Sequence, residues 1–141
     1  MSDEPLFMAL DDDAPEVRAT VAAARASLGL LREFCELPNA LDLNPCVKLL
    51  VADGDAAANL WLRVVGLDGA DFVGQFFELP PEFVSYTTDD LVPVAEADVL
   101  DWMVNDGGDL HGGYSLRLQR ATLPPEERAG YDEYVGVRRY V

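Results

Sequence analysis

Apolar side chains recur at helical spacing in the first third of the chain. The positions, separated alternately by four and three residues, are Val17, Val21, Ala24, Leu28, Leu31 and Cys35. This spacing places all of them on one stripe of an α-helix. Asp13 and Glu16 form a capping-box pattern around Pro15 at the start, and the Pro-Asn pair at residues 38–39 supplies a stop. The sequence therefore predicts one long helix from Asp13 to this stop.

Shorter apolar runs replace the helical pattern after residue 45. Residues 47–51 and 60–65 are rich in Val and Leu, which predicts two strands. The Asp-Gly pair at residues 68–69 suits a tight hairpin, and residues 72–77 are predicted to return antiparallel. Gly74 inside this return strand indicates a bulge or a close backbone contact.

The next part of the chain holds weaker strand signals. The Pro-Pro pair after the return strand interrupts pairing because proline has no backbone N–H to donate. Residues 82–86 and 91–94 are short strand candidates, whereas residues 99–104 fit either a strand or one helical turn. The Asn-Asp-Gly-Gly sequence at residues 105–108 predicts a turn.

The C-terminal part is predicted to add a strand and a helix. Residues 114–119 alternate between apolar and polar positions, which favours a strand. Residues 124–128 open a helix with acidic side chains in its first turn, and Gly136 ends it. We therefore expect one α+β domain over residues 13–141. Its mainly antiparallel twisted sheet, of about five strands, is flanked by a long N-terminal helix and a short C-terminal helix. Residues 1–12 are expected to form a mobile acidic tail.

Net charge narrows the choice of partner. The chain carries 26 Asp and Glu against 10 Lys and Arg, a formal charge of −16 at pH 7. Nucleic acid and anionic membranes would be repelled over much of such a surface. The acidity is concentrated in residues 49–116, where 13 acids face one base, whereas residues 117–141 hold four acids and five bases. We therefore expect a non-catalytic interaction domain whose acidic face meets a basic partner protein, as in an antitoxin or an immunity protein that masks a basic nuclease.

Three arginines accompany the apolar stripe of the first helix. Arg18, Arg25 and Arg32 recur every seven residues and form a row beside the stripe. Because the repeat is short, we expect their stems to pack over the core edge and their heads to pair with carboxylates of the same domain. The alternative is a structural homo-oligomer, such as a homodimer, joined through this helix.

The single histidine is the one candidate for catalysis. His111 lies in a glycine-rich stretch near Asp106 and Asp109, and a carboxylate that orients an imidazole can make it a general base. A nucleophile such as Ser115, or one of the two cysteines, would have to be brought close by the fold. No nucleophile elbow or recognised Cys or Ser catalytic motif is present, so a small enzyme built on this loop is the alternative function.

The same region invites a test for metal ligands. The carboxylates in question are Asp98, Asp101, Asp106 and Asp109. In a calcium loop, acids alternate before the glycine, but here Trp102 or Met103 would occupy the first ligand position. The glycines also lack the phosphate-binding pattern GxxxxGK[ST]. We expect neither a dedicated metal site nor a cofactor.

The two tryptophans have different surroundings. Trp61 lies in the middle of a predicted strand among apolar neighbours, so we expect it to pack in the core. Trp102 follows Asp101 and precedes a turn, which fits either a core position or an anchor for a partner.

Cysteine use and the N-terminus bear on the compartment. Cys35 and Cys46 make neither a disulfide framework nor a metal motif, and buried free thiols suit a reducing cytosol. The N-terminal residues lack the basic and apolar regions of a secretory signal, and no apolar run reaches the ~20 residues that span a bilayer. We therefore expect a cytoplasmic protein.

Several motifs from Trp61 onward, taken in order, resemble a known family. They are WLRV, FVGQFFELP, DDLVPV, VLDWMV, NDGGDLHGGYSLRLQR and PPEERAGYDE. The order resembles the YegJ-like bacterial family of domains of unknown function over residues 47–135. The most specific parts are Asp101-Trp102-Met103 and Gly112-Gly113-Tyr114 with Arg117. The chain departs from the family pattern at residues 59–60, 89 and 124, where the motifs have His-Met, Gly and Ser.

The resemblance implies a small α+β fold and brings no established activity, cofactor or catalytic residue. Its matching residues are typical of fold maintenance, because Gly112 and Gly113 allow close backbone approach, Tyr114 can bury its ring, and Arg117 can reach Asp101 or another carboxylate. We prefer this interpretation to a binding site. If the region does bind a partner, the candidate residues are Asp98, Asp101, Trp102, Asp106, Asp109, Tyr114 and Arg117.

Overall fold

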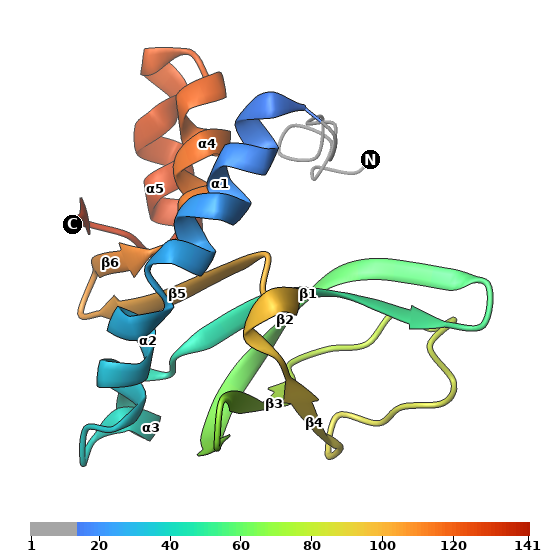
Figure 1. Ribbon diagram of the computed structural model, residues 1–141. Helices are drawn as coiled ribbons and strands as arrows, with labels where there is room; N and C mark the ends of the chain where they lie inside the picture. Colours follow the sequence, from blue (N-terminus) through green and yellow to red (C-terminus); the bar gives the residue numbers. More distant parts are fainter. Residues whose placement is uncertain (1–13) are drawn as a thin grey trace.

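The computed structural model describes residues 14–141 and forms one seven-stranded sheet with helices packed on it (Figure 1). The predicted tail over residues 1–12 and the predicted N-cap Asp13 lie outside the described residues. The strands are β1 (Cys46–Asp53), β2 (Ala56–Asp68), β3 (Asp71–Phe76), β4 (Leu91–Val94), β5 (Asp101–Asp106), β6 (Asp109–Gly112) and β7 (Arg139–Tyr140). The α-helices are α1 (Pro15–Ala26), α2 (Leu28–Cys35), α3 (Ala40–Leu43), α4 (Tyr114–Thr122) and α5 (Arg128–Val135), and the 3-10 turns are η2 (Glu96–Asp98) and η3 (Pro125–Glu127).

The order of strands in the sheet is β4-β3-β2-β1-β5-β6-β7. Every neighbouring pair is antiparallel except β6 and β7, which are parallel. This confirms the α+β class and the mainly antiparallel sheet, but the strands number seven instead of about five. Helices α1, α4 and α5 gather at one end of the molecule, whereas the β1–β2 hairpin extends away from them (Figure 1). No helix of the described residues is long and apolar enough to cross a membrane.

The N-terminal helix is two helices instead of one long one. The chain leaves helical geometry at Ser27, whose φ and ψ are −110° and 14°, between α1 and α2. The apolar stripe continues across this break, because Ala24, Leu28 and Leu31 are all buried in the core. The spacing therefore identified the buried face correctly. It could not reveal the break, since the positions on either side keep the same period.

Residues 114–119 form the first part of helix α4, so the predicted strand is wrong. Helix α4 starts after Gly113, which adopts a left-handed φ of 64°. The carboxylate of Asp101 accepts hydrogen bonds from the backbone N–H groups of Tyr114 (3.0 Å) and Ser115 (2.8 Å), groups that have no partner within a helix. A residue from another strand thus starts this helix, which the local alternation of side chains does not reveal.

Residues 82–86 form no strand either. They belong to a long connection between β3 and β4, in which Phe83 is 5 % exposed and reaches the core. The ring of Tyr86 lies 5.5 Å from that of Phe76 in an edge contact. The aromatic residues that suggested a strand therefore serve to attach the connection to the sheet.

The predicted hairpin and the role of Gly74 are confirmed. Asp68 pairs with Asp71 across a turn in which Gly69 has a φ of 62°. The register between β2 and β3 shifts between Val64 and Gly66, opposite Gly74. A Cβ atom at Gly74 would lie 2.8 Å from Cδ2 of Leu62, so this position holds both a bulge and a close contact. Residues 91–94 form a strand as predicted, and residues 99–104 resolve to the strand that begins at Asp101.

Candidate functional site

The most densely bonded of the candidate residues is Asp101. It is fully buried at the start of β5, and its carboxylate accepts bonds from the backbone N–H groups of Trp102, Tyr114 and Ser115 and from the Ser115 hydroxyl. Burial raises the pKa of the Asp101 carboxyl above its ordinary value, although these hydrogen bonds oppose the shift. Because every bond serves the junction between β5 and α4, Asp101 joins and caps elements of the fold.

Trp102 and Tyr114 continue this network toward the N-terminal helices. Trp102 is 0 % exposed, and its indole Nε1 donates to Oγ of Ser27 at 2.9 Å. The hydroxyl of Tyr114 donates to the same oxygen at 3.0 Å, and Ser27 donates in turn to the carbonyl of Ala23. The break between α1 and α2 thus places one hydroxyl where both aromatic side chains need it. Trp102 is a core residue and cannot anchor a partner.

The two glycines of the Gly-Gly-Tyr motif are required by this packing. Gly112 has a φ of 69°, and a Cβ atom there would collide with the carbonyl oxygen of Trp102. The N–H of Gly113 donates to that same oxygen at 2.6 Å. The motif therefore lets α4 begin directly against β5.

Arg117 contacts carbonyl oxygens and reaches no carboxylate, which corrects the expectation that it pairs with Asp101 or another acid. Its guanidinium donates to the carbonyls of Gly112 (2.8 Å), Leu110 (3.1 Å) and Val141 (2.6 Å). Arg117 consequently ties β6 to the end of the chain after β7.

The structure does not gather the proposed catalytic groups into a reaction site. His111 lies on β6, where its ring packs 4.8 Å from that of Phe34 on α2. Asp109 binds Arg139 through two bonds of 2.7 and 2.9 Å, and this partner holds the pKa of Asp109 below its ordinary value. Asp106 is exposed at the turn after β5.

The candidate nucleophiles are equally committed or inactive. The hydroxyl of Ser115 is bonded to Asp101. Burial raises the pKa of Cys46 to about 12 and that of Cys35 to about 11, so both remain thiols at neutral pH. As for metals, the residues that the structure describes contain no group of three or more His, Cys, Asp or Glu that could hold an ion.

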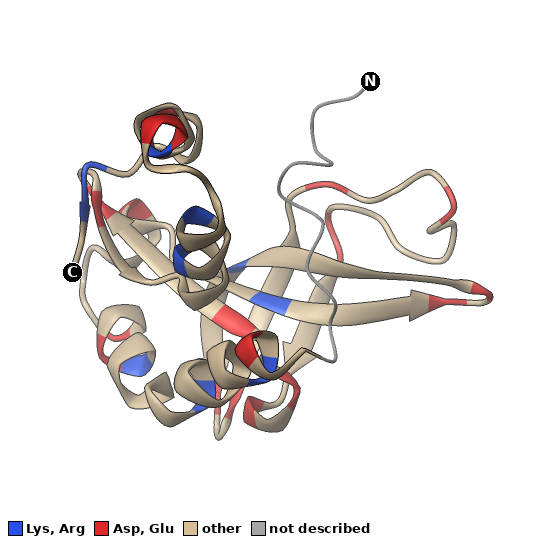
Figure 2. Cartoon of the chain, turned by 90° about the horizontal axis from the view of Figure 1, so that it is seen from above, with Lys and Arg blue, Asp and Glu red and all other residues tan. Residues whose placement is uncertain are grey.

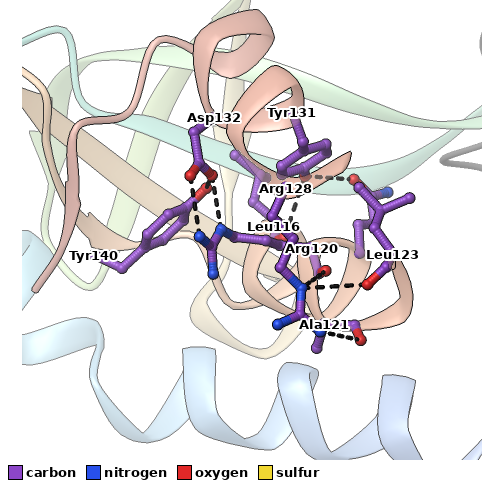
Figure 3. A network of polar contacts seen from close by, with 9 residues as sticks. Leu116, Arg120, Ala121, Leu123, Arg128, Tyr131, Asp132 and Tyr140 are labelled. Atoms are coloured by element: carbon purple, nitrogen blue, oxygen red, sulfur yellow. Dashed lines mark hydrogen bonds and ion pairs between the residues drawn. The ribbon is translucent and has the colours of Figure 1, made fainter. Parts of the chain in front are cut away.

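Arginines at the helical end are bonded mainly to their own neighbourhood (Figure 3). Arg120 binds the carboxylate of Asp132 at 2.7 and 3.1 Å, and Tyr140 donates to the same carboxylate at 2.6 Å. Arg128 donates to three carbonyls near the end of α4. The prediction that arginines of the first helix pair with carboxylates is confirmed for Arg32, which binds Glu96, whereas Arg25 donates to the carbonyl of Val99. Little of this positive charge therefore reaches the acids of the sheet region.

The sheet region presents an acidic surface that the sequence placed only by its charge. We call residues 77–91, the connection between β3 and β4 with the first residue of β4, the acidic loop. It contains Glu78, Glu82, Asp89 and Asp90 and no Lys or Arg. Figure 2 shows acidic positions along this loop and at the tip of the β1–β2 hairpin, whereas blue positions concentrate around the helices. Asp53 joins the two features, because its carboxylate accepts two 2.8 Å bonds from Ser85.

Large apolar side chains are exposed among these acids. Val84 is 83 % exposed, Leu91 60 % and Phe77 39 %. The loop is nevertheless held in place by Phe83, which is buried, and by the bonds between Ser85 and Asp53. A strand prediction for residues 82–86 concealed this surface, since it assigned alternate side chains to a sheet.

Trp61 is half-buried and lies outside the core, contrary to expectation. It points to the side of β2 opposite the buried Leu62, because neighbouring residues of a strand alternate in direction. The ammonium group of Lys48, its partner in the register of β1 and β2, lies 5.9 Å from the centre of its ring.

Comparisons with known proteins identify the family. The family model described as "Uncharacterized protein conserved in bacteria (DUF2314)" matches residues 17–138. The chain is 26% identical over 96 residues to "Uncharacterized protein YegJ" of Escherichia coli (strain K12), an alignment that covers 67% of this chain and 63% of that protein. No solved structure matches the chain. Because the family model spans most of the chain, as the motifs around Trp102 and Tyr114 led us to expect, the protein belongs to the bacterial DUF2314 family.

Proposed function

We propose that this protein is a non-catalytic interaction domain that binds a basic partner protein through the acidic loop. The observation that carries the proposal is the combination, in one anchored loop, of four acids, no base and three exposed apolar side chains. Large apolar side chains at a surface, surrounded by polar groups of one charge, are typical of protein interfaces.

The charge would act mainly on the rate and the selectivity of binding. Complementary potentials steer a positive partner toward a negative surface and disfavour partners of like charge. Val84, Leu91 and Phe77 would supply the contact area that excludes water. An antitoxin or immunity-like protein that covers a basic nuclease is one version of this function.

The test is affinity capture of proteins from the native cell at low salt, followed by mass spectrometry of what elutes as salt rises. The test variant is E78Q/E82Q/D89N, which removes three charges from the acidic loop. The matched control is E126Q/E127Q/E133Q, which removes three exposed charges at the helical end. We expect wild type and control to retain a basic protein that the loop variant loses.

Elution of that partner should also shift to lower salt in the loop variant, because screening weakens exposed charge pairs. Identical capture by the wild type and the loop variant would contradict the proposal, as would elution that does not depend on salt.

A further inference from the structure

A groove on the other side of the sheet has the features of a small-molecule site. It lies between α1 and the β1–β2 hairpin and has a volume of about 230 Å³. Its apolar wall consists of Val17 and Val21 from α1, Leu50 from β1, and Leu100 before β5. Small-molecule sites are typically concave and mostly apolar, with a few placed polar groups.

The polar groups of the groove are few and have different roles. Lys48 and Asn59 line it from β1 and β2, and Ser115 lines it from the first turn of α4. The Ser115 hydroxyl donates its hydrogen to Asp101, so it can only accept a bond from a ligand. Lys48 brings positive charge, and it is the only lysine of the chain. The donors that face a ligand are therefore the Lys48 ammonium and the Asn59 amide.

We propose that this groove binds a small carboxylic acid with an unbranched apolar tail. The carboxylate lies at Lys48 and the amide of Asn59, and the tail lies among Val21, Leu50 and Leu100. A single ammonium matches one negative charge, whereas a phosphate dianion would bring twice that charge to a strongly acidic protein. The groove is smaller than sites for drug-sized ligands, which favours a tail of roughly six to eight carbons.

The experiment titrates the full chain with octanoate and, separately, with octanol by calorimetry. The charge variant is Lys48→Met, which keeps the length of the side chain, and its conservative partner is Lys48→Arg. The tail variant is Leu50→Asn, at a side chain that is 61 % exposed and therefore tolerant of change. The matched control is Arg63→Met, which removes the cation at the other end of the same hairpin, where it bonds Asn44 and covers Phe77.

We expect Lys48→Met to weaken octanoate at least tenfold and to leave octanol unchanged, while Lys48→Arg and Arg63→Met bind octanoate as the wild type does. Leu50→Asn should weaken both ligands. Trp61 emission should change on octanoate binding, because the ammonium of Lys48 lies near its ring. Absence of saturable binding would overturn the proposal, and so would equal affinity of the wild type and Lys48→Met. Tighter binding of N-acetyl-leucine than of octanoate would overturn it in favour of a peptide carboxyl terminus.

Discussion

The helical end and the acidic loop treat charge in opposite ways. At the helical end, Asp101 is fully buried with four hydrogen bonds, and Asp132 binds both Arg120 and Tyr140. In the acidic loop, the carboxylates of Glu78, Glu82 and Asp89 face water without a single cation in the same segment. Charges of the first kind hold elements together, whereas charges of the second kind are available to a partner. The difference predicts where substitutions affect stability and where they affect binding.

The largest effect is expected at Asp101. Asp101→Ala leaves the buried N–H groups of Trp102, Tyr114 and Ser115 without their acceptor, which should cost about 3–5 kcal/mol in the free energy of unfolding. Asp101→Asn keeps one acceptor oxygen and should cost less. Urea denaturation measures both, with Asp98→Ala as the exposed control, expected to change stability by less than about 0.5 kcal/mol. A similar small loss for Asp101→Ala would show that the carboxylate does not hold α4 to β5.

Gly112→Ala should have the next largest effect. Ala at this position combines a left-handed φ of 69° with a collision against the carbonyl of Trp102, and we expect a loss of about 3 kcal/mol. The matched control is Gly107→Ala, where φ is 60° but the space around a Cβ atom is open, and its cost should be about 1 kcal/mol. Equal losses in urea denaturation would contradict the close packing of β5 against the start of α4.

These two residues also show what the sequence could and could not predict. The apolar period from Val17 to Cys35 and the Asp-Gly hairpin at residues 68–69 were predicted correctly, because each depends on residues close together in the chain. Helix α4 was misassigned because its start depends on Asp101, which precedes it by a strand and a turn. Sequence motifs identified Asp101, Trp102 and Gly112 as a structural set, but only the fold shows which atoms they join.

The acidic surface was predictable in amount but not in place. Counting charges assigned the acidity to residues 49–116, and the structure narrows the exposed part to the loop and the tip of the hairpin. Val84 and Phe83 are adjacent in sequence and both apolar, yet one is 83 % exposed and the other 5 %. This difference depends on how the loop folds back on the sheet. For the same reason the sequence placed Trp61 in the core, although it lies on the opposite side of β2.

The ion pair of Asp132 should give the helical end a distinct pH dependence. The hydrogen bonds from Arg120, with a further one from Tyr140, hold the pKa of Asp132 below its ordinary value of 3.8. Because the folded pKa is the lower one, the stabilisation is present above pH 3.8 and is lost as pH falls through the folded value. In urea denaturation from neutral to acid pH, the wild type should exceed Asp132→Asn in stability at neutral pH, and the gap should close below about pH 4.

The exposed neighbour Glu133 provides the control for this measurement. Glu133→Gln removes a carboxylate one residue away and should leave the free energy of unfolding close to that of the wild type throughout. A gap between the wild type and Asp132→Asn that persists or widens in acid would show that the bonds to Arg120 do not stabilise the charged form.

The smallest effect on stability is expected in the acidic loop. The variant E78Q/E82Q/D89N removes repulsion between like charges, so its stability in low salt should equal or exceed that of the wild type by a few tenths of a kcal/mol. Salt screens this repulsion, so the two proteins should converge as ionic strength rises. The control E126Q/E127Q/E133Q, at a helical end that carries nearly balanced charge, should show a smaller difference in low salt. A marked loss of stability in the loop variant would mean that these carboxylates hold the fold, and any loss of partner capture could then no longer be assigned to the interface itself.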